Sequence, residues 1–314
     1  MNTPTFTTLR NANGLAVDLV NVGAGIAGIR VPTKSGETPI VLGYASAKDY
    51  LDDTYAMGST CGRFANRIRR GRFEIDGKAY QVDVDPDIGH SLHGGRDGFQ
   101  KKLWTLTATI PTHAQYRLTS TDNDCGFPGE LAVQVDYFLS EAGTLSIEFE
   151  ATTDAPTVVN LVNHAYFNLH GPGETIEGHH LRVVANQYTE IDDDLVPTGT
   201  IASTAPAGLD LSGETELQQH RFDHNFVISG YDGSLREVAQ LFSPKSSIRL
   251  TVRSTLPGLQ VYTSDSLGPP FRPRAGICLE AQQFPDAPNH GSFPNTVLRP
   301  GQVYRSRTEY CFSQ

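Results

Sequence analysis

The sequence reads LAVQVDYF at residues 131–138, where large apolar side chains occupy every second position. These side chains are Leu131, Val133, Val135 and Tyr137. Successive side chains of a β-strand point to opposite faces of the sheet, so this spacing predicts a strand with one buried face.

The same period of two recurs along the chain, and long helical periodicity does not. Residues 145–150 and 248–253 alternate in the same way. Residues 47–53 favour a short helix, and residues 235–241 are ambiguous between helix and strand. Turn signals separate the alternating runs, among them Asn13-Gly14, Asp76-Gly77, Pro257-Gly258 and Pro300-Gly301. This pattern predicts an all-β fold, a large antiparallel β-sandwich. No shift in composition divides the chain, so we expect one domain spanning residues 1–314.

Charge and hydropathy exclude several classes of partner. The formal net charge is −10, from 35 acidic and 25 basic residues, and no Lys/Arg stripe is present. A nucleic acid or an anionic membrane surface is therefore not an expected partner. No apolar stretch approaches the roughly 20 residues that cross a bilayer, and the N-terminus lacks the features of a signal peptide. We therefore predict a cytoplasmic protein.

The four cysteines are widely spaced and form no C-x-x-C motif. They are Cys61, Cys125, Cys278 and Cys311. In a reducing compartment this pattern predicts free thiols, some of them in the core. Cys278 lies two residues before Glu280, but its apolar neighbours favour the interior of a strand over a catalytic role.

A glycine-rich motif near the N-terminus, GAGIAG at residues 23–28, matches G-x-G-x-x-G. Dinucleotide binding requires a helix directly after this motif. Pro32 and Gly36 would break such a helix, so we interpret the motif as a glycine turn between two strands.

The first candidate for chemistry is His164, at the centre of LVNHAYFNL, residues 161–169. Histidine titrates near neutral pH and can therefore give or take a proton. An isolated histidine here would more often be a core residue. Asn163, Tyr166 and Asn168 crowd the same segment, however, and each must find a hydrogen-bond partner in the protein or in a ligand.

The second candidate is Glu280, which lies between apolar residues in ICLEA, residues 277–281. If this strand is central, burial displaces the pKa of the carboxyl group: desolvation raises it, and a nearby arginine lowers it. An outward-facing strand glutamate is the alternative.

Several polar residues are candidates for binding a polyhydroxylated ligand. Arg63 and Asn66 lie in GRFANR, and His93 precedes two glycines, which allow close approach of a ligand. Asp223 lies between aromatic residues in FDHNF, and Gln260 lies in GLQVY. A surface position is the alternative for Arg63.

Metal ligation is not expected. His90 and His93 form H-x-x-H, and His179 and His180 are adjacent, but neither pattern matches a strong metal-binding spacing. No G-x-S-x-G motif indicates a serine hydrolase.

Taken together, these segments resemble the aldose 1-epimerase family, also called galactose mutarotases. The matching pieces occur in the family's order along nearly the whole chain. They are residues 41–44, 62–68, 92–95, 163–169, 197–199, 223–226, 279–282 and 293–301.

The resemblance implies a large β-sandwich that interconverts the α and β anomers of free aldoses, with galactose and glucose as the usual substrates and without a cofactor. It implies that His164 is the general acid and Glu280 the general base. Arg63, His93, Asp223 and Gln260 fall at sugar-binding positions, and we add Asn66 to that set. The chain departs from the family pattern at residues 262–265 and 125–129 and at Ala281, none of which removes a catalytic group.

Three alternatives remain open at this point. A hexose 6-phosphate epimerase would need a phosphate clamp, for which Arg272 and Arg274 are available. A non-catalytic sugar-binding protein would have no use for the pair of His164 and Glu280. A metal-dependent enzyme on a β-fold is the third. The sequence is compatible with either a monomer or a homodimer.

Overall fold

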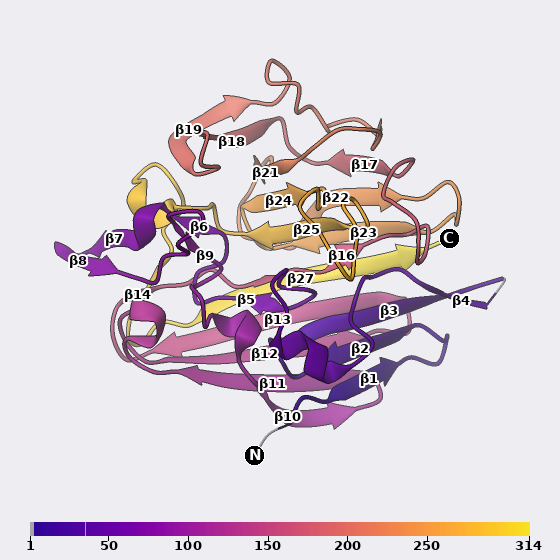
Figure 1. The fold of residues 1–314 in the computed structure, drawn as a ribbon, viewed down its shortest axis with the longest axis horizontal. Coiled ribbons are helices and arrows are strands. Elements are labelled where there is room, and N and C mark those ends of the chain that lie inside the picture. The colour runs from indigo at the N-terminus through magenta and orange to yellow at the C-terminus, as the bar shows by residue number, and fades with distance from the viewer. Residues whose placement is uncertain (1–2, 35) are drawn as a thin grey trace.

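The computed structural model describes residues 3–34 and 36–314, which form antiparallel sheets (Figure 1). No α-helix occurs in this part of the chain, and no helix in it is long and apolar enough to cross a membrane. The helical residues form short 3₁₀ turns: η1 (Ala47–Leu51), η2 (Arg69–Gly71), η3 (Phe99–Lys101), η4 (Asp124–Gly126) and η5 (Ala287–Asn289). The predicted all-β antiparallel fold is confirmed, and the helix expected at residues 47–53 is η1.

The largest sheet has nine strands and contains the alternating runs. Its order is β10 (Thr105–Ile110), β11 (His113–Ser120), β12 (Leu131–Leu139), β13 (Thr144–Thr153), β27 (Tyr304–Ser313), β23 (Arg249–Ser254), β22 (Arg236–Phe242), β17 (His180–Val183) and β20 (Thr215–Glu216). In β12 the side chains of Leu131, Val133, Val135 and Tyr137 are buried, as their spacing predicts. The ambiguous residues 235–241 belong largely to strand β22.

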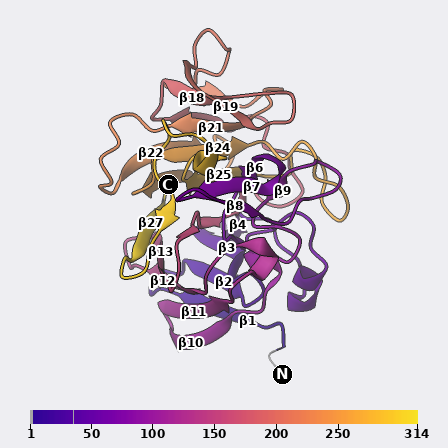
Figure 2. The same cartoon turned by 90° about the vertical axis from the view of Figure 1, so that its left-hand side faces the viewer.

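A six-stranded sheet packs against the first one and carries the candidate site. Its order is β16 (Tyr166–Phe167), β25 (Ile277–Gln282), β24 (Gly258–Tyr262), β21 (Asp223–Val227), β18 (Gln187–Ile191) and β19 (Pro197–Ser203). Strands β18, β21 and β24 of this sheet lie side by side in Figures 1 and 2. One apolar cluster contains side chains from both sheets, including Leu250, Leu259 and Leu279. Every residue of β25 is buried. Since both faces of this strand are covered, its sequence shows no alternation.

The N-terminal strands form a four-stranded meander: β1 (Phe6–Arg10), β2 (Ala16–Val20), β3 (Gly25–Thr33) and β4 (Gly36–Pro39). The glycine motif at residues 23–28 spans the turn between β2 and β3 and the start of β3, and these two strands pair antiparallel. Gly23 has a φ of +66°, and a Cβ on it would lie 2.7 Å from the Ser59 side chain. The prediction of a glycine turn is confirmed.

Four short strand pairs hold residues 60–93 and the C-terminal segment near the six-stranded sheet. They are β5 (Thr60–Cys61) with β15 (Val162–Asn163), β6 (Arg67–Ile68) with β9 (Ser91–Leu92), β7 (Arg72–Ile75) with β8 (Lys78–Gln81), and β14 (Thr157–Val158) with β26 (Val297–Leu298). All four pairs are antiparallel. They bring the segment of His93 next to the segment of His164.

Two further expectations concern the chain as a whole. The cysteines are free thiols, as predicted, and Cys61 and Cys278 are buried. The largest apolar cluster contains residues from Leu9 to Phe312. The boundaries of a single domain at residues 1–314 stay a prediction, and they include Met1, Asn2 and Ser35, which lie outside the described residues.

Gly77 and Gly94 have similar positive φ angles but different surroundings. Substituting each by alanine therefore distinguishes the cost of backbone strain from the cost of a steric clash. Gly94 has a φ of +86°, and a Cβ on it would lie 2.0 Å from the Gly62 carbonyl oxygen. Gly77 has a φ of +80°, with no heavy atom within 4 Å of such a Cβ. We expect Gly77→Ala to lower the free energy of unfolding by about 1 kcal/mol, because it adds only backbone strain. Gly94→Ala should lower it by about 3 kcal/mol or more, because the backbone must also move. Urea unfolding measures both, and equal losses would contradict the steric account.

Candidate active site

His164 and Glu280 meet at the edge of the six-stranded sheet. His164 lies between β15 and β16, and its backbone is held from both sides: its N–H donates to Ser59 (2.9 Å) and its carbonyl accepts from Gly58 (3.0 Å). Glu280 extends from β25, and its Oε1 lies 3.5 Å from Nε2 of His164. The two residues are 5% and 2% exposed. The structure therefore brings together the predicted acid and base in a site that is largely shielded from water.

Burial shifts the pKa values of both groups toward their neutral forms. It raises the pKa of Glu280 well above its usual value, as does the charge of Asp223, while Arg67 opposes the shift. Burial lowers the pKa of His164 to about 4. In the pair of a protonated Glu280 and a neutral His164, the carboxyl proton is the one that can be transferred between the two residues. Moving that proton to the imidazole gives a carboxylate beside an imidazolium without any exchange with solvent.

His93 lies across from His164 and is held by the backbone of Asn66. The ring centroids of the two histidines are 5.2 Å apart, with ring planes at 82°. Nδ1 of His93 accepts from the Asn66 N–H (3.2 Å), so its other ring nitrogen can donate to a ligand. Burial and the nearby His164 lower the pKa of His93, which favours its neutral form. Asn66 acts here through its backbone, since its side-chain oxygen accepts from the Arg67 N–H (2.8 Å).

Asp223 and Gln260 form the second predicted group of polar side chains. Nε2 of Gln260 donates to Oδ1 of Asp223 (2.6 Å). Behind them, Nε2 of Gln282 donates to Oε1 of Gln260 (3.3 Å) and to Asn225 (3.0 Å). Gln282 thereby orients the Gln260 amide with its NH₂ group toward Asp223. Gln282 was not among the residues predicted from the sequence. Its position two residues after Glu280 in the same strand was the available signal, because such residues share a face.

Arg63 does not extend toward this group, contrary to the expectation that it contacts a sugar. Its guanidinium donates to the carbonyls of Pro128 (2.8 Å), Gly129 (2.7 Å) and Ser120 (3.1 Å). It is 1% exposed, and burial lowers its pKa to about 10. Its guanidinium is therefore used to hold the loop before β12.

Arg67 takes the place that we had expected for Arg63. Its Nη2 lies 3.8 Å from Oδ2 of Asp223, and its side chain is 13% exposed. Both arginines belong to GRFANR, and residue type alone does not distinguish them. The pairing of Arg67 with Leu92, directly before His93, places Arg67 beside the site.

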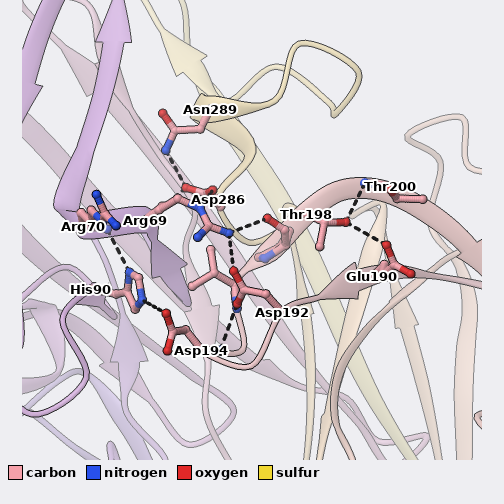
Figure 3. A network of polar contacts seen from close by, with 12 residues as sticks. Arg69, Arg70, His90, Glu190, Asp192, Asp194, Thr198, Thr200, Asp286 and Asn289 are labelled. Atoms are coloured by element: carbon pink, nitrogen blue, oxygen red, sulfur yellow. Dashed lines mark hydrogen bonds and ion pairs between the residues drawn. The ribbon is translucent and has the colours of Figure 1, made fainter.

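A network of ionic and polar contacts fixes the backbone around Arg67 (Figure 3). The Asp286 N–H donates to the Arg67 carbonyl (2.8 Å), and Oδ1 of Asp286 accepts from the Arg69 N–H (2.9 Å) and from Asn289 (2.6 Å). The Arg69 guanidinium donates to Oδ2 of Asp192 (2.7 Å), at the tip of the β18–β19 hairpin. Three segments that are distant in sequence are thereby joined behind the site.

The polar residues around His164 donate to carbonyl groups of the protein. Asn163 donates to the Gly58 carbonyl (2.8 Å), the Tyr166 hydroxyl to the Tyr55 carbonyl (2.8 Å), and Asn168 to the Ala275 carbonyl (2.8 Å). The ring of Tyr166 has its centroid 5.0 Å from that of His164. These residues build the wall of the site, which leaves the ionisable groups and Gln260 for a ligand.

His90 and His179, two of the histidines considered as metal ligands, make structural contacts. His90 accepts from the Arg70 N–H (2.9 Å) and lies near Asp194 (Figure 3). His179 contacts the Ile176 carbonyl (2.9 Å) through Nδ1 and accepts from the Leu169 N–H (2.9 Å) through Nε2. The site thus offers a proton-transfer pair beside one carboxylate, one guanidinium and one amide. This set suits acid–base chemistry on a neutral polyhydroxylated molecule.

Replacing the two arginines should lower the free energy of unfolding by very different amounts. Arg63→Ala leaves several buried carbonyls without donors, and we expect a loss of about 3 kcal/mol or more in the free energy of unfolding. Arg67→Ala removes one partly exposed contact and should cost less than about 1 kcal/mol. Chemical unfolding of the two variants tests the difference. A larger loss for Arg67→Ala would contradict these placements.

Comparisons with known proteins place this arrangement in context. A model of the aldose 1-epimerase family matches residues 6–311. The chain is 34% identical to an aldose 1-epimerase of Escherichia coli, covering 97% of this chain and 94% of that protein. It is 37% identical to a galactose mutarotase of Rattus norvegicus, covering 95% and 91%. Among solved structures, an aldose epimerase homologue from C. elegans superimposes with a TM-score of 0.93 at 30% identity, covering 99% of each chain. A galactose 1-epimerase from Lactobacillus acidophilus gives 0.86 at 25% identity, covering 99% and 95%.

Proposed function

Because the chain belongs to the aldose 1-epimerase family, we propose that it interconverts the α and β anomers of free aldohexoses such as galactose and glucose. The observation that carries the proposal is the buried pair of His164 and Glu280, with Nε2 and Oε1 3.5 Å apart, beside Asp223 and Arg67. The reaction needs only proton transfers between side chains and sugar.

Ring opening requires two proton transfers at opposite ends of the bond that breaks. Glu280 removes the proton of the C1 hydroxyl, and the imidazolium of His164 protonates the ring oxygen. The open aldehyde then rotates about its C1–C2 bond. On closure the neutral His164 takes the proton from the ring hydroxyl, and Glu280 returns one to O1. Each well-placed acid or base contributes roughly 10²- to 10⁴-fold to such a rate.

Burial of the pair favours the forward transfers. The reactive form carries a carboxylate and an imidazolium, and ring opening converts both into neutral groups. Since burial raises the pKa of Glu280 and lowers that of His164, it makes the first a stronger base and the second a stronger acid. The shielded site therefore makes each proton transfer between the charged pair and the sugar more favourable.

The remaining polar groups hold the sugar against the pair. Asp223 has a side chain that is 30% exposed, so its carboxylate is open to sugar hydroxyls. Arg67, Gln260 and His93 supply donors around it. Arg67 replaces Arg63 in our assignment, and Asn66 contributes by positioning His93.

The positions of Arg272 and Arg274 do not favour the alternative of a hexose 6-phosphate epimerase, which would need both arginines to bind the phosphate. Arg274 is 8% exposed and donates to the carbonyls of His220 (2.9 Å) and Gln218. Arg272 donates to the carbonyl of Gly173. The buried Arg274 is thus engaged by backbone carbonyls, and the exposed Arg272 by itself would not form a clamp.

The assignment of the base is tested by Glu280→Gln, with Glu309→Gln as a matched control. Glu309 is a second buried strand glutamate (5% exposed), which pairs with Arg253 on the nine-stranded sheet. Polarimetry on freshly dissolved α-D-galactose and α-D-glucose measures the approach to the final rotation. We expect Glu280→Gln to lose roughly 10³-fold or more of the enzymatic rate, because an amide accepts no proton at neutral pH.

Glu309→Gln should retain the rate of the parent protein. Wild-type acceleration in Glu280→Gln would refute the base assignment. If the parent protein bound both sugars without accelerating the change in rotation, the non-catalytic alternative would replace the proposal.

The role of Arg67 is tested by the kinetics of Arg67→Ala. Loss of a charged hydrogen bond of about 1.5–3 kcal/mol should lower kcat/KM by roughly 10- to 100-fold. The folded fraction of Arg63→Ala should keep the KM of the parent protein, since its guanidinium donates to the loop before β12 and to Thr157 and not to the Asp223 group. An unchanged KM and kcat in Arg67→Ala would remove this residue from the binding site.

A further inference from the structure

Cys278 joins the acid and the base in a compact group of three possible metal ligands. One ligand atom from each of His164, Cys278 and Glu280 lies within 4.8 Å of the other two, and all three residues are buried. Sγ of Cys278 lies 3.5 Å from Nδ1 of His164, whereas Oε1 of Glu280 lies 3.5 Å from Nε2 of the same ring. The proposed proton transfers involve His164 and Glu280, and the Cys278 thiol has no role in them.

We propose that His164, Cys278 and Glu280 form a binding site for Zn²⁺ or a similar divalent cation, and that its occupation inhibits the enzyme. This inference goes beyond the proposed function, since it concerns an inhibitor and not the sugar. The ion would occupy the base and the acid at once, so inhibition should be competitive with sugar.

One separation within the group already matches that of a tetrahedral zinc site, and the other ligand atoms lie within 4.8 Å of one another. Bonds of about 2.3 Å to sulfur and about 2.0–2.1 Å to nitrogen or oxygen place ligand atoms about 3.4–3.6 Å apart. Sγ of Cys278 and Nδ1 of His164 already have this separation. The carboxylate of Glu280, whose Oε1 now faces Nε2, must move toward an ion bound at Nδ1, and its buried Oε2 has no hydrogen-bond partner that the movement would break.

The charges of the ligands also suit a divalent cation in a buried place. A thiolate and a carboxylate together neutralise the two positive charges, so the occupied site holds no net charge. Burial raises the pKa of the Cys278 thiol, so this group is protonated without an ion. Binding breaks the S–H bond of Cys278 and the O–H bond of the protonated Glu280 and forms metal–sulfur and metal–oxygen bonds, and both protons leave to solvent without any oxidation or reduction. A donor set of sulfur, nitrogen and oxygen favours Zn²⁺ over Mg²⁺ or Ca²⁺, which prefer oxygen ligands alone.

Cobalt provides a direct test, because Co²⁺ enters zinc sites and absorbs light when bound to a thiolate. The full-length protein is titrated with Co²⁺ alone, and thiolate-to-cobalt charge-transfer absorption in the near ultraviolet is recorded. Cys278→Ser is compared with Cys311→Ser, which removes a half-buried thiol on β27. We expect the band in the parent protein and in Cys311→Ser, and its loss in Cys278→Ser. Absence of the band in the parent protein, or its persistence in Cys278→Ser, would overturn the proposal.

Inhibition provides the second readout. Zn²⁺ should slow the change in sugar rotation reversibly, with recovery on addition of a chelator. The zinc concentration for half-inhibition should rise by at least about tenfold in Cys278→Ser and stay unchanged in Cys311→Ser. An equal zinc sensitivity of the two variants would overturn the proposal.

If Cys278→Ser fails to fold by circular dichroism, Glu280→Gln replaces it in the cobalt titration. That variant should keep the band and lose at least about tenfold in cobalt affinity, and an unchanged affinity would overturn the site. The cobalt band does not depend on catalysis. A protein without mutarotase activity that shows the band would refute the proposed function and leave the metal site standing.

Discussion

The contact between His164 and Glu280 inside a covered sheet is the constraint on which the site depends. Ionising both a carboxyl group and an imidazole that are almost wholly buried costs desolvation free energy. Burial therefore favours their neutral forms. The same burial makes the charged pair reactive, because transferring its protons to and from a sugar removes two charges from a region of low dielectric constant. The strand β25, covered on both faces, creates this environment for Glu280.

Two carboxylates in one site have different environments, and the difference separates their roles. Glu280 is 2% exposed and has one unpartnered oxygen, whereas the side chain of Asp223 is 30% exposed and is held by Gln260 and Arg67. A carboxylate with donors around it binds hydroxyl groups, and a desolvated one accepts a proton more strongly. The network around Asp286 and Arg69 (Figure 3) holds the backbone of Arg67, because the Asp286 N–H donates to the Arg67 carbonyl.

Residue patterns located the segments of the site better than the individual side chains within them. The alternation in residues 131–138 corresponds to the observed burial of β12, because one face of that strand is exposed to solvent. The run at residues 277–282 has no such alternation, and pattern alone left Glu280 open to an outward-facing position. In GRFANR the choice between two arginines depended on which one faces Asp223, and Gln282 was missed because its contact with Gln260 crosses between strands.

The sequence by itself determined the all-β class, the free thiols, the glycine turn at residues 23–28 and the family. These features depend on side-chain periodicity, backbone freedom and ordered motifs, all of which are local properties of the chain. Only the tertiary structure decided that Arg63 holds a loop while Arg67 enters the site, and that Cys278 lies against His164. Those relations depend on which strands pair and on which faces they bury, and such long-range packing is not encoded in the spacing of any single segment.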